Sequence, residues 1–138
     1  MQASRGSFSQ AAKAAQVATQ EIMTILLALP EKVSTNAVYS GMHWSKRKDL
    51  ADLYHLSLYP HRKVQTKEYP VEITYRFRFK GRALDTTNCT FMAKLIEDGL
   101  VANAIIKNDD PEHVYASHIY STKGRKDEVE ITILAKGA

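Results

Sequence analysis

Cysteine and long apolar segments are scarce in this sequence, and each shortage excludes a class of protein. Cys89 is the only cysteine, so a disulfide within the chain and a zinc site of several cysteines are both excluded. A single cysteine is also typical of the reducing cytoplasm. The longest apolar run, residues 22–29, is interrupted by Thr24 and is far shorter than the ~20 residues that span a membrane. We therefore expect a cytoplasmic protein with no membrane partner.

Familiar motifs of nucleotide and metal chemistry are missing as well. The six glycines form no phosphate-binding loop or dinucleotide fingerprint, and no H-E-x-x-H pattern occurs. The five histidines show no paired ligand spacing. None of them lies near Cys89 in sequence, so we expect Cys89 to be a small buried residue rather than a nucleophile. Catalytic chemistry, if the chain has any, is expected to rest on its acids and lysines.

The composition is that of one ordinary globular domain with a modest positive charge. Hydrophobic residues make up 44% and charged residues 25% of the 138 residues, which is enough for a real core. Lysine and arginine number 19 against 15 acids, for a net charge of +4. This excess favours an anionic partner without requiring one. Residues 1–20 are rich in Ala, Gln and Ser, so we expect a helical or disordered extension before a single domain at 21–138.

Hydrophobic periodicity predicts a small α+β domain. Short apolar or alternating runs predict strands, and apolar residues at helical spacing predict two helices. The expected elements are a strand at 22–29, a helix at about 45–58, a strand at 71–80, a helix at about 88–103, and strands at 113–122 and 128–134 joined as a hairpin. The order strand, helix, strand, helix, hairpin indicates a mixed sheet of about four strands with two helices packed on it.

Two basic surfaces are expected on these elements. In the strand at 71–80, Arg76, Arg78 and Lys80 alternate with apolar residues and share the exposed face, where they could follow a nucleic-acid backbone. At the start of the first helix, Ser45 is placed as the N-cap, and the cations at 46–48 crowd the first turn. A bound phosphate could offset the unfavourable helix dipole there. An ordinary solvated surface is the competing interpretation for both.

Acidic residues surround the second helix. Asp85 and Asn88 lie at its start, Lys94 and Asp98 share its polar side, and a pair of acids follows at 109–110. Carboxylates in a basic protein suit metal-dependent phosphodiester chemistry. A helix of roughly fifteen residues is ~22 Å long, so acids at its two ends meet only if residues 104–108 double back along it. A helix cap, a turn and an exposed ion pair are the structural alternative.

From about Ile22 onward, the sequence resembles the RusA family of Holliday-junction resolvases, small endonucleases frequent in phage and prophage genomes. Four features carry the resemblance: N-x-x-Y at 36–39, a basic helix start at 44–48, K-x-x-x-D-G-L at 94–100, and the acid pair at 109–110 before a strand. Each is weak alone, and their order and spacing give the resemblance its specificity.

For that family, the resemblance implies a homodimer that requires Mg²⁺ or Mn²⁺ and nicks four-way DNA junctions symmetrically in recombination and repair. Lys94 matches the catalytic lysine and Asp109 an essential acid. We therefore expect catalysis by Asp85, Lys94 and Asp109. The metal would be held by Asp85, Asp109, Asp110 and Asp98. The residues expected to bind DNA are Asn36, Lys46, Arg47, Arg76, Arg78 and Asn88.

The sequence departs from the family pattern just before Lys94. The family shows D-x-D-N ahead of its lysine, and an alignment on Lys94 puts Asn88 and Thr90 at the two acid positions. An alignment on Asn88 instead puts Thr87 where the second acid should be. Two other functions are therefore kept open. One is a DNA-binding protein that has lost catalysis on the same scaffold, and the other is a phage structural or assembly protein.

Overall fold

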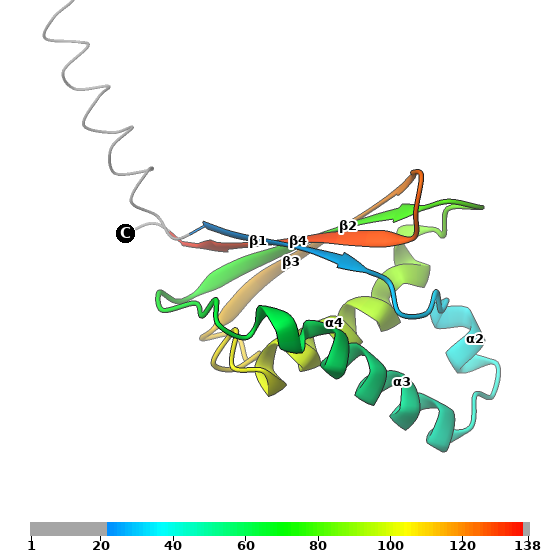
Figure 1. Cartoon of the computed structure of the whole chain (residues 1–138), viewed down its shortest axis with the longest axis horizontal. Helices are drawn as coiled ribbons and strands as arrows, with labels where there is room; N and C mark the ends of the chain where they lie inside the picture. Colours follow the sequence, from blue (N-terminus) through cyan, green and yellow to red (C-terminus); the bar gives the residue numbers. More distant parts are fainter. Residues whose placement is uncertain (1–21, 137–138) are drawn as a thin grey trace, which may run out of the picture.

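The computed structural model describes residues 22–136, so the expected N-terminal extension lies outside the described residues. Figure 1 shows a sheet with its helices on one side. In chain order the elements are β1 (Ile22–Ala28), α2 (Thr35–Tyr39), α3 (Trp44–Leu58), β2 (Val71–Phe79), α4 (Thr90–Ala102), β3 (Val114–Lys123) and β4 (Glu128–Ala135). Short 3-10 turns at Tyr59–His61 and Thr86–Cys89 follow α3 and precede α4.

The four strands form one mixed sheet in the order β1-β4-β2-β3, which confirms the expected α+β class. β2 runs parallel to β3 and antiparallel to β4, and β4 runs antiparallel to β1. The predicted hairpin of the last two strands is wrong, because β2 lies between them. The turn after β3 crosses the end of β2, where the Gly124 N–H donates to the carbonyl of Phe79 at 2.8 Å.

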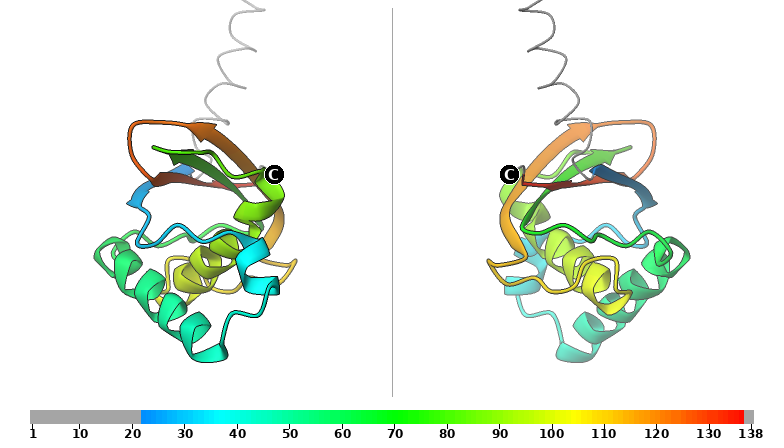
Figure 2. Two further views of the ribbon diagram at one scale, coloured as in Figure 1. Left: turned by 90° about the vertical axis from the view of Figure 1, so that its right-hand side faces the viewer. Right: turned by 90° about the vertical axis from the view of Figure 1, so that its left-hand side faces the viewer.

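The core lies between the sheet and the helix pair α3 and α4, which cover the same sheet face (Figure 2). The alternation predicted for β2 is confirmed, since all five of its odd-numbered residues are buried. α4 contributes an apolar side that was also predicted. The largest fully buried side chains are Tyr54, Tyr75, Phe77, Phe79, Leu50, Leu58, Ile73, Met92, Ile96, Leu100, Ile105 and Ile106.

The first helix differs from its prediction in two details. His43, rather than Ser45, is the N-cap of α3, because its Nδ1 accepts the Ser45 N–H at 3.1 Å. Leu53, whose helical spacing from Leu50 would suit a core position, is 41% exposed, since only Leu50, Tyr54 and Leu58 of this helix are buried. Within residues 22–136, no helix combines the length and apolar character needed to cross a membrane.

Residues 31–41, for which no helix or strand was predicted, contain the short helix α2. Ser34 caps this helix by accepting the Ala37 N–H at 3.1 Å. Val33 and Thr35 are buried at its start, so the segment is anchored to the domain. α2 lies near the beginning of α4, below the end of the sheet where β2 and β3 finish (Figure 1).

Candidate functional site

Lys94 stands at the centre of a charged cluster on the polar side of α4. Its Nζ lies 2.9 Å from Asp98 Oδ1 on the same helix and 3.8 Å from Asp109 Oδ2 in the following loop. The contact with Asp98 follows from the spacing of four residues between the two side chains on one helix. The Asp109 contact joins two of the three predicted catalytic residues.

The loop after α4 brings Asp109 back to Lys94. Ala104 has a φ of 57°, and this left-handed residue ends the helix and reverses the chain. The N–H groups of Ile105 and Ile106 both donate to the carbonyl of Leu100. Both isoleucine side chains are fully buried, so the apolar core anchors the reversed segment. The chain therefore doubles back as far as Lys94, but it does not bring Asp109 to Asp85 at the start of the helix.

Glu97 is a further acid of this cluster, and it was not predicted as a site residue. Its carboxylate accepts the Tyr75 hydroxyl at 3.0 Å from the sheet below. Burial raises the pKa of Glu97 above its usual value, and the Asp109 and Asp98 carboxylates act in the same direction. Burial, with Glu97 nearby, also raises the pKa of Tyr75, so this phenol stays a hydrogen-bond donor at neutral pH. Glu97 follows Lys94 by three residues, and this helical spacing was the sequence signal that could have placed it in the cluster.

The cluster keeps Lys94 positively charged. The hydrogen bond to Asp98 raises the pKa of Lys94, and the charges of Asp98, Asp109 and Glu97 add to the effect. The Lys94 side chain is exposed, with 61% of its surface accessible. An ammonium held in this way can bind a phosphate oxygen that approaches from solvent.

Asp85, the third predicted catalytic residue, lies before the 3-10 turn that leads into α4. Its side chain does not cap that turn. The acids that act on Lys94 are Asp98, Asp109 and Glu97, and Asp85 forms no ion pair among residues 22–136. Asp85 is thus not part of the Lys94 cluster. It lies near Cys89, whose thiol pKa is raised chiefly by burial and also by the Asp85 charge.

Asp110 is used by the turn in front of β3. Its carboxylate accepts the backbone N–H groups of Glu112 and His113 and bonds the His113 ring at 2.7 Å. The hydrogen bond from His113 holds the pKa of Asp110 below its usual value. The Asn108 amide donates to its other oxygen at 3.0 Å. Asp110 therefore has the turn-forming role that was the alternative to metal binding.

The start of α4 carries neutral side chains that already have partners. The Asn88 side-chain oxygen accepts the Asn36 N–H at 3.1 Å, and the Thr90 hydroxyl lies 2.9 Å from that of Thr35. Thr35 also accepts the Phe91 N–H at 3.0 Å. These contacts attach α2 to α4. In the alignment on Lys94, Asn88 and Thr90 occupy the two acid positions, and here their oxygens serve the fold instead.

The predicted metal donors do not fit a bound Mg²⁺ or Mn²⁺. Of the four, Asp98 and Asp109 face the Lys94 ammonium and Asp110 faces its own turn, while Asp85 lies outside the cluster. Among the described residues, no three acidic, histidine or cysteine side chains are grouped so that they could hold a metal ion. In this arrangement the four predicted donors do not converge on one point, and the carboxylates of Asp98 and Asp109 are directed at the Lys94 ammonium.

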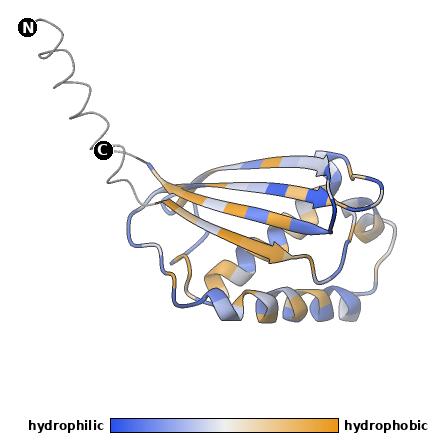
Figure 3. Ribbon diagram, turned by 45° about the horizontal axis from the view of Figure 1, so that its top comes forward, coloured by the Kyte–Doolittle hydropathy of each residue, from blue (hydrophilic) through white to orange (hydrophobic). Residues whose placement is uncertain are grey.

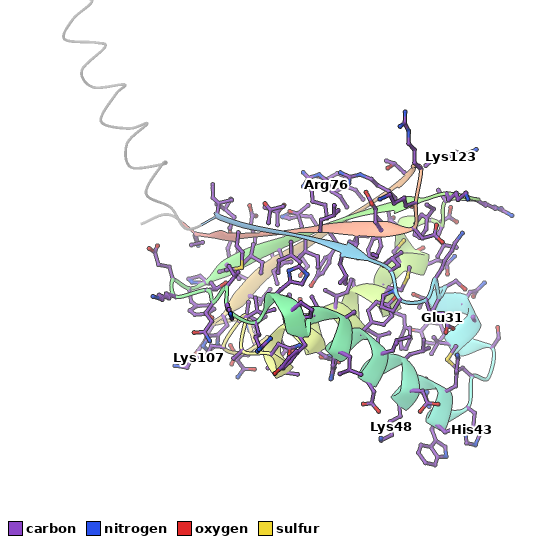
Figure 4. The ribbon with its side chains drawn as sticks, viewed as in Figure 1. Glu31, His43, Lys48, Arg76, Lys107 and Lys123 are labelled. Atoms are coloured by element: carbon purple, nitrogen blue, oxygen red, sulfur yellow. The ribbon has the colours of Figure 1, made fainter. Side chains whose placement is uncertain are left out.

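The basic residues expected to bind DNA are divided between two faces. Arg78 lies on the uncovered sheet face but is paired with Glu128 at 3.0 Å and Glu130 at 3.7 Å. Arg76 on the same face stacks over the Tyr120 ring, with its guanidinium carbon 5.1 Å from the ring centre. Figure 3 shows this uncovered face as a mixture of hydrophobic and hydrophilic residues, and Figure 4 shows Arg76 projecting from it. The face is therefore not a continuous cationic track.

The basic start of α3 projects away from the sheet. Lys46 is paired with Glu31 at 3.2 Å and Lys48 with Asp52 at 3.4 Å. Arg47 is exposed beside them. Figure 4 shows His43 and Lys48 at the far end of the helix layer from the sheet. Two of the three cations are thus balanced locally, as a solvated surface would be.

No known protein-family model matches this chain, and no curated protein sequence matches it. The likeness to RusA resolvases therefore rests on the motifs and their spacing.

Proposed function

We propose that this chain recognises branched DNA, with the four-way junction as its preferred form, on a scaffold like that of the RusA resolvases. The observation that carries the proposal is the meeting of Lys94 with Asp109. These residues match the family's lysine and essential acid, and a reversed chain brings them together at 3.8 Å on an exposed surface. An exposed ion pair adds very little to the stability of a fold, so stability alone does not account for this contact.

We further propose that the chain binds such DNA without cleaving it efficiently. At least one carboxylate expected from the resemblance is missing before Lys94. The neutral residue there is Thr87 in the alignment on Asn88, or Asn88 and Thr90 in the alignment on Lys94, and these last two are hydrogen-bonded to α2. Asp98 and Asp109 are directed at Lys94. The cationic Lys94 can then bind a phosphate that displaces one of these carboxylates, while a hydrolytic centre lacks donors. Homodimerisation belongs to this proposal, since a four-way junction presents two-fold related arms.

The Mg²⁺- or Mn²⁺-dependent resolvase is the second candidate. The close approach of Lys94 and Asp109 favours it, because a phosphodiester bound by Lys94 would also lie beside a carboxylate. Asp98 and Glu97 supply further negative charge at the same place. This candidate requires the carboxylates to leave Lys94 when DNA binds.

One set of measurements separates these functions. A labelled four-way junction and a linear duplex of the same arm sequence are titrated with the protein without divalent metal. They are then incubated with Mg²⁺ or Mn²⁺ and analysed for nicks. We expect tighter binding of the junction and little nicking. Symmetric nicking that is lost in Asp109→Asn would establish the resolvase. Equal binding of junction and duplex at physiological salt would instead favour a structural or assembly protein.

A further inference from the structure

Six cationic side chains gather at the end of the sheet where β2 and β3 finish, and of these only Lys80 belonged to a surface that the sequence suggested for nucleic-acid binding. Five belong to the segments 80–82 and 123–127, which contain a single acid, Asp127. The sixth is Lys32, just after β1. We call this set the basic end; its members are Lys32, Lys80, Arg82, Lys123, Arg125 and Lys126.

Backbone contacts hold these segments together. Phe79 and Lys123, the last residues of β2 and β3, are paired in the sheet, and the Gly124 N–H donates to the Phe79 carbonyl. The Lys80 N–H donates to Asp127 Oδ1 at 2.9 Å, so the single acid is engaged with the backbone. Lys32 Nζ donates to the Arg82 carbonyl at 2.6 Å. Hydrogen bonds to the backbone thus fix the segments that carry these positive charges. Figure 4 places Lys123 at this end of the sheet.

The basic end differs from the other cationic surfaces in its lack of neutralising partners. Lys46, Arg78 and Lys94 are each paired with a carboxylate. Among residues 22–136, none of the six side chains of the basic end forms a salt bridge, and five of them are exposed. Unpaired surface lysines and arginines gain most from phosphate contacts, because no existing ion pair has to be broken.

The basic end is continuous with the candidate site along the chain. Arg82 is followed by Asp85 and then by Asn88, whose side chain contacts Asn36 of α2. α2 lies below the same end of the sheet in Figure 1. A DNA arm that lies against the basic end would lead toward α2 and the start of α4. This is the direction of Lys94.

We infer that the basic end binds the phosphate backbone of one duplex arm of a branched DNA. The inference rests on the proposed function for the identity of the ligand. It transfers the main DNA contact from the uncovered sheet face and the start of α3 to the turn between β3 and β4. These contacts are to phosphates, so they carry no sequence specificity.

The test compares the full-length protein with two variants of equal net charge. Lys80→Gln/Lys123→Gln/Lys126→Gln removes three charges from the basic end. Lys63→Gln/Lys107→Gln/Lys136→Gln removes three from elsewhere on the surface and is the control. Binding to a four-way junction and to a linear duplex is measured by fluorescence anisotropy between about 50 and 200 mM salt, the range over which phosphate contacts dominate the change in affinity.

We expect the basic-end variant to bind the junction about tenfold more weakly or worse, with a salt-dependence slope smaller by about three, one for each lost phosphate contact. The control variant should keep most of the junction affinity and most of the salt-dependence slope of the wild type. If the two variants behave alike while the wild type binds, the inference is overturned and the proposed function stands. If the wild type binds duplex as well as junction, and only the basic-end variant is weak, the proposed function fails and the inference stands. A wild type that binds no DNA overturns both.

Discussion

Lys94 shares its ammonium with two carboxylates on an exposed surface, so this cluster should contribute little to stability. The side chains of Lys94 and Asp109 are 61% and 35% exposed, and exposed pairs are worth up to about 1 kcal/mol. We therefore expect Asp109→Asn to change the free energy of unfolding by less than about 1 kcal/mol in urea titrations. A loss well above this would show that Asp109 mainly holds the loop, and a change in DNA binding or cleavage could no longer be assigned to its charge.

Glu97 should make the stability of the fold depend on pH. Burial raises its pKa in the folded state, so its ionisation opposes folding. Protonated Glu97 contributes fully to the free energy of unfolding below the pKa of glutamate in the unfolded chain, about 4.3. This contribution is lost as pH rises through the pKa of Glu97 in the folded protein. Glu97→Gln keeps an acceptor for the Tyr75 hydroxyl. We expect the variant to melt at a higher temperature than the wild type at pH 7, with the difference vanishing near pH 4. A lower melting temperature at pH 7 would mean that the charged hydrogen bond outweighs burial.

Cys89 should be chemically inert until the protein unfolds. Its side chain is fully buried, and burial raises the pKa of the thiol, so both access and thiolate formation are suppressed. We expect a thiol reagent such as DTNB to react at least about a hundredfold more slowly with the folded protein than with protein in urea. Fast labelling of the folded protein would show that the start of α4 opens readily.

The contact of α3 with α4 depends on Gly99. A Cβ at this position would lie 2.6 Å from Leu58 Cδ1 and 3.3 Å from His55 Cδ2, and Leu58 is fully buried. Gly99→Ala gains about 1 kcal/mol of helix propensity but overpacks the interface at a cost of about 1–3 kcal/mol. We expect a net loss of about 1 kcal/mol in the free energy of unfolding.

The control for this substitution is Gly81→Ala in the loop after β2. A Cβ there would have no atom within 4 Å, so the change should stay within about 0.5 kcal/mol. Equal effects of the two substitutions would show that the helix pair repacks without cost.

The elements themselves could be predicted because each has a strong local pattern. β2 alternates strictly, and α4 has a full apolar side, so both were placed within about two residues. The strand order could not be predicted in the same way. The turn at 123–127 has the composition of a hairpin, but the apolar faces of β2 and β4 both belong at the centre of the sheet, where β2 separates β3 from β4. A local hydrophobic pattern does not determine which distant strands pair with each other.

The candidate site was only partly accessible from the sequence for the same reason. Lys94 and Asp98 are neighbours on one helix, and their contact follows from spacing. The approach of Asp109 to Lys94 depends on the left-handed conformation of Ala104. Alanine rarely adopts this conformation, so the sequence does not predict it. The Tyr75 contact with Glu97 crosses from sheet to helix and had no local signal.

At the scale of the whole molecule, charge is distributed unevenly. Lys46, Lys48, Arg78 and Lys94 are paired with carboxylates, whereas among residues 22–136 none of the six cations of the basic end forms a salt bridge. A net charge of +4 understates this local concentration. Binding of any polyanion should therefore be salt-dependent and oriented, with one end of the sheet as the first contact.

The central position of β4 governs the order in which a newly made chain can fold. Within residues 22–136, β1 has no neighbour in the sheet other than β4, and β4 is the last of the four strands along the chain. During synthesis on the ribosome, β1 and the antiparallel edge of β2 must therefore wait unpaired until residues 128–135 emerge. A chain ending at Asp127 should show no cooperative thermal transition by circular dichroism, and a cooperative one would mean that β1 finds another partner. Completion of this domain is thus an event that follows translation of its final strand.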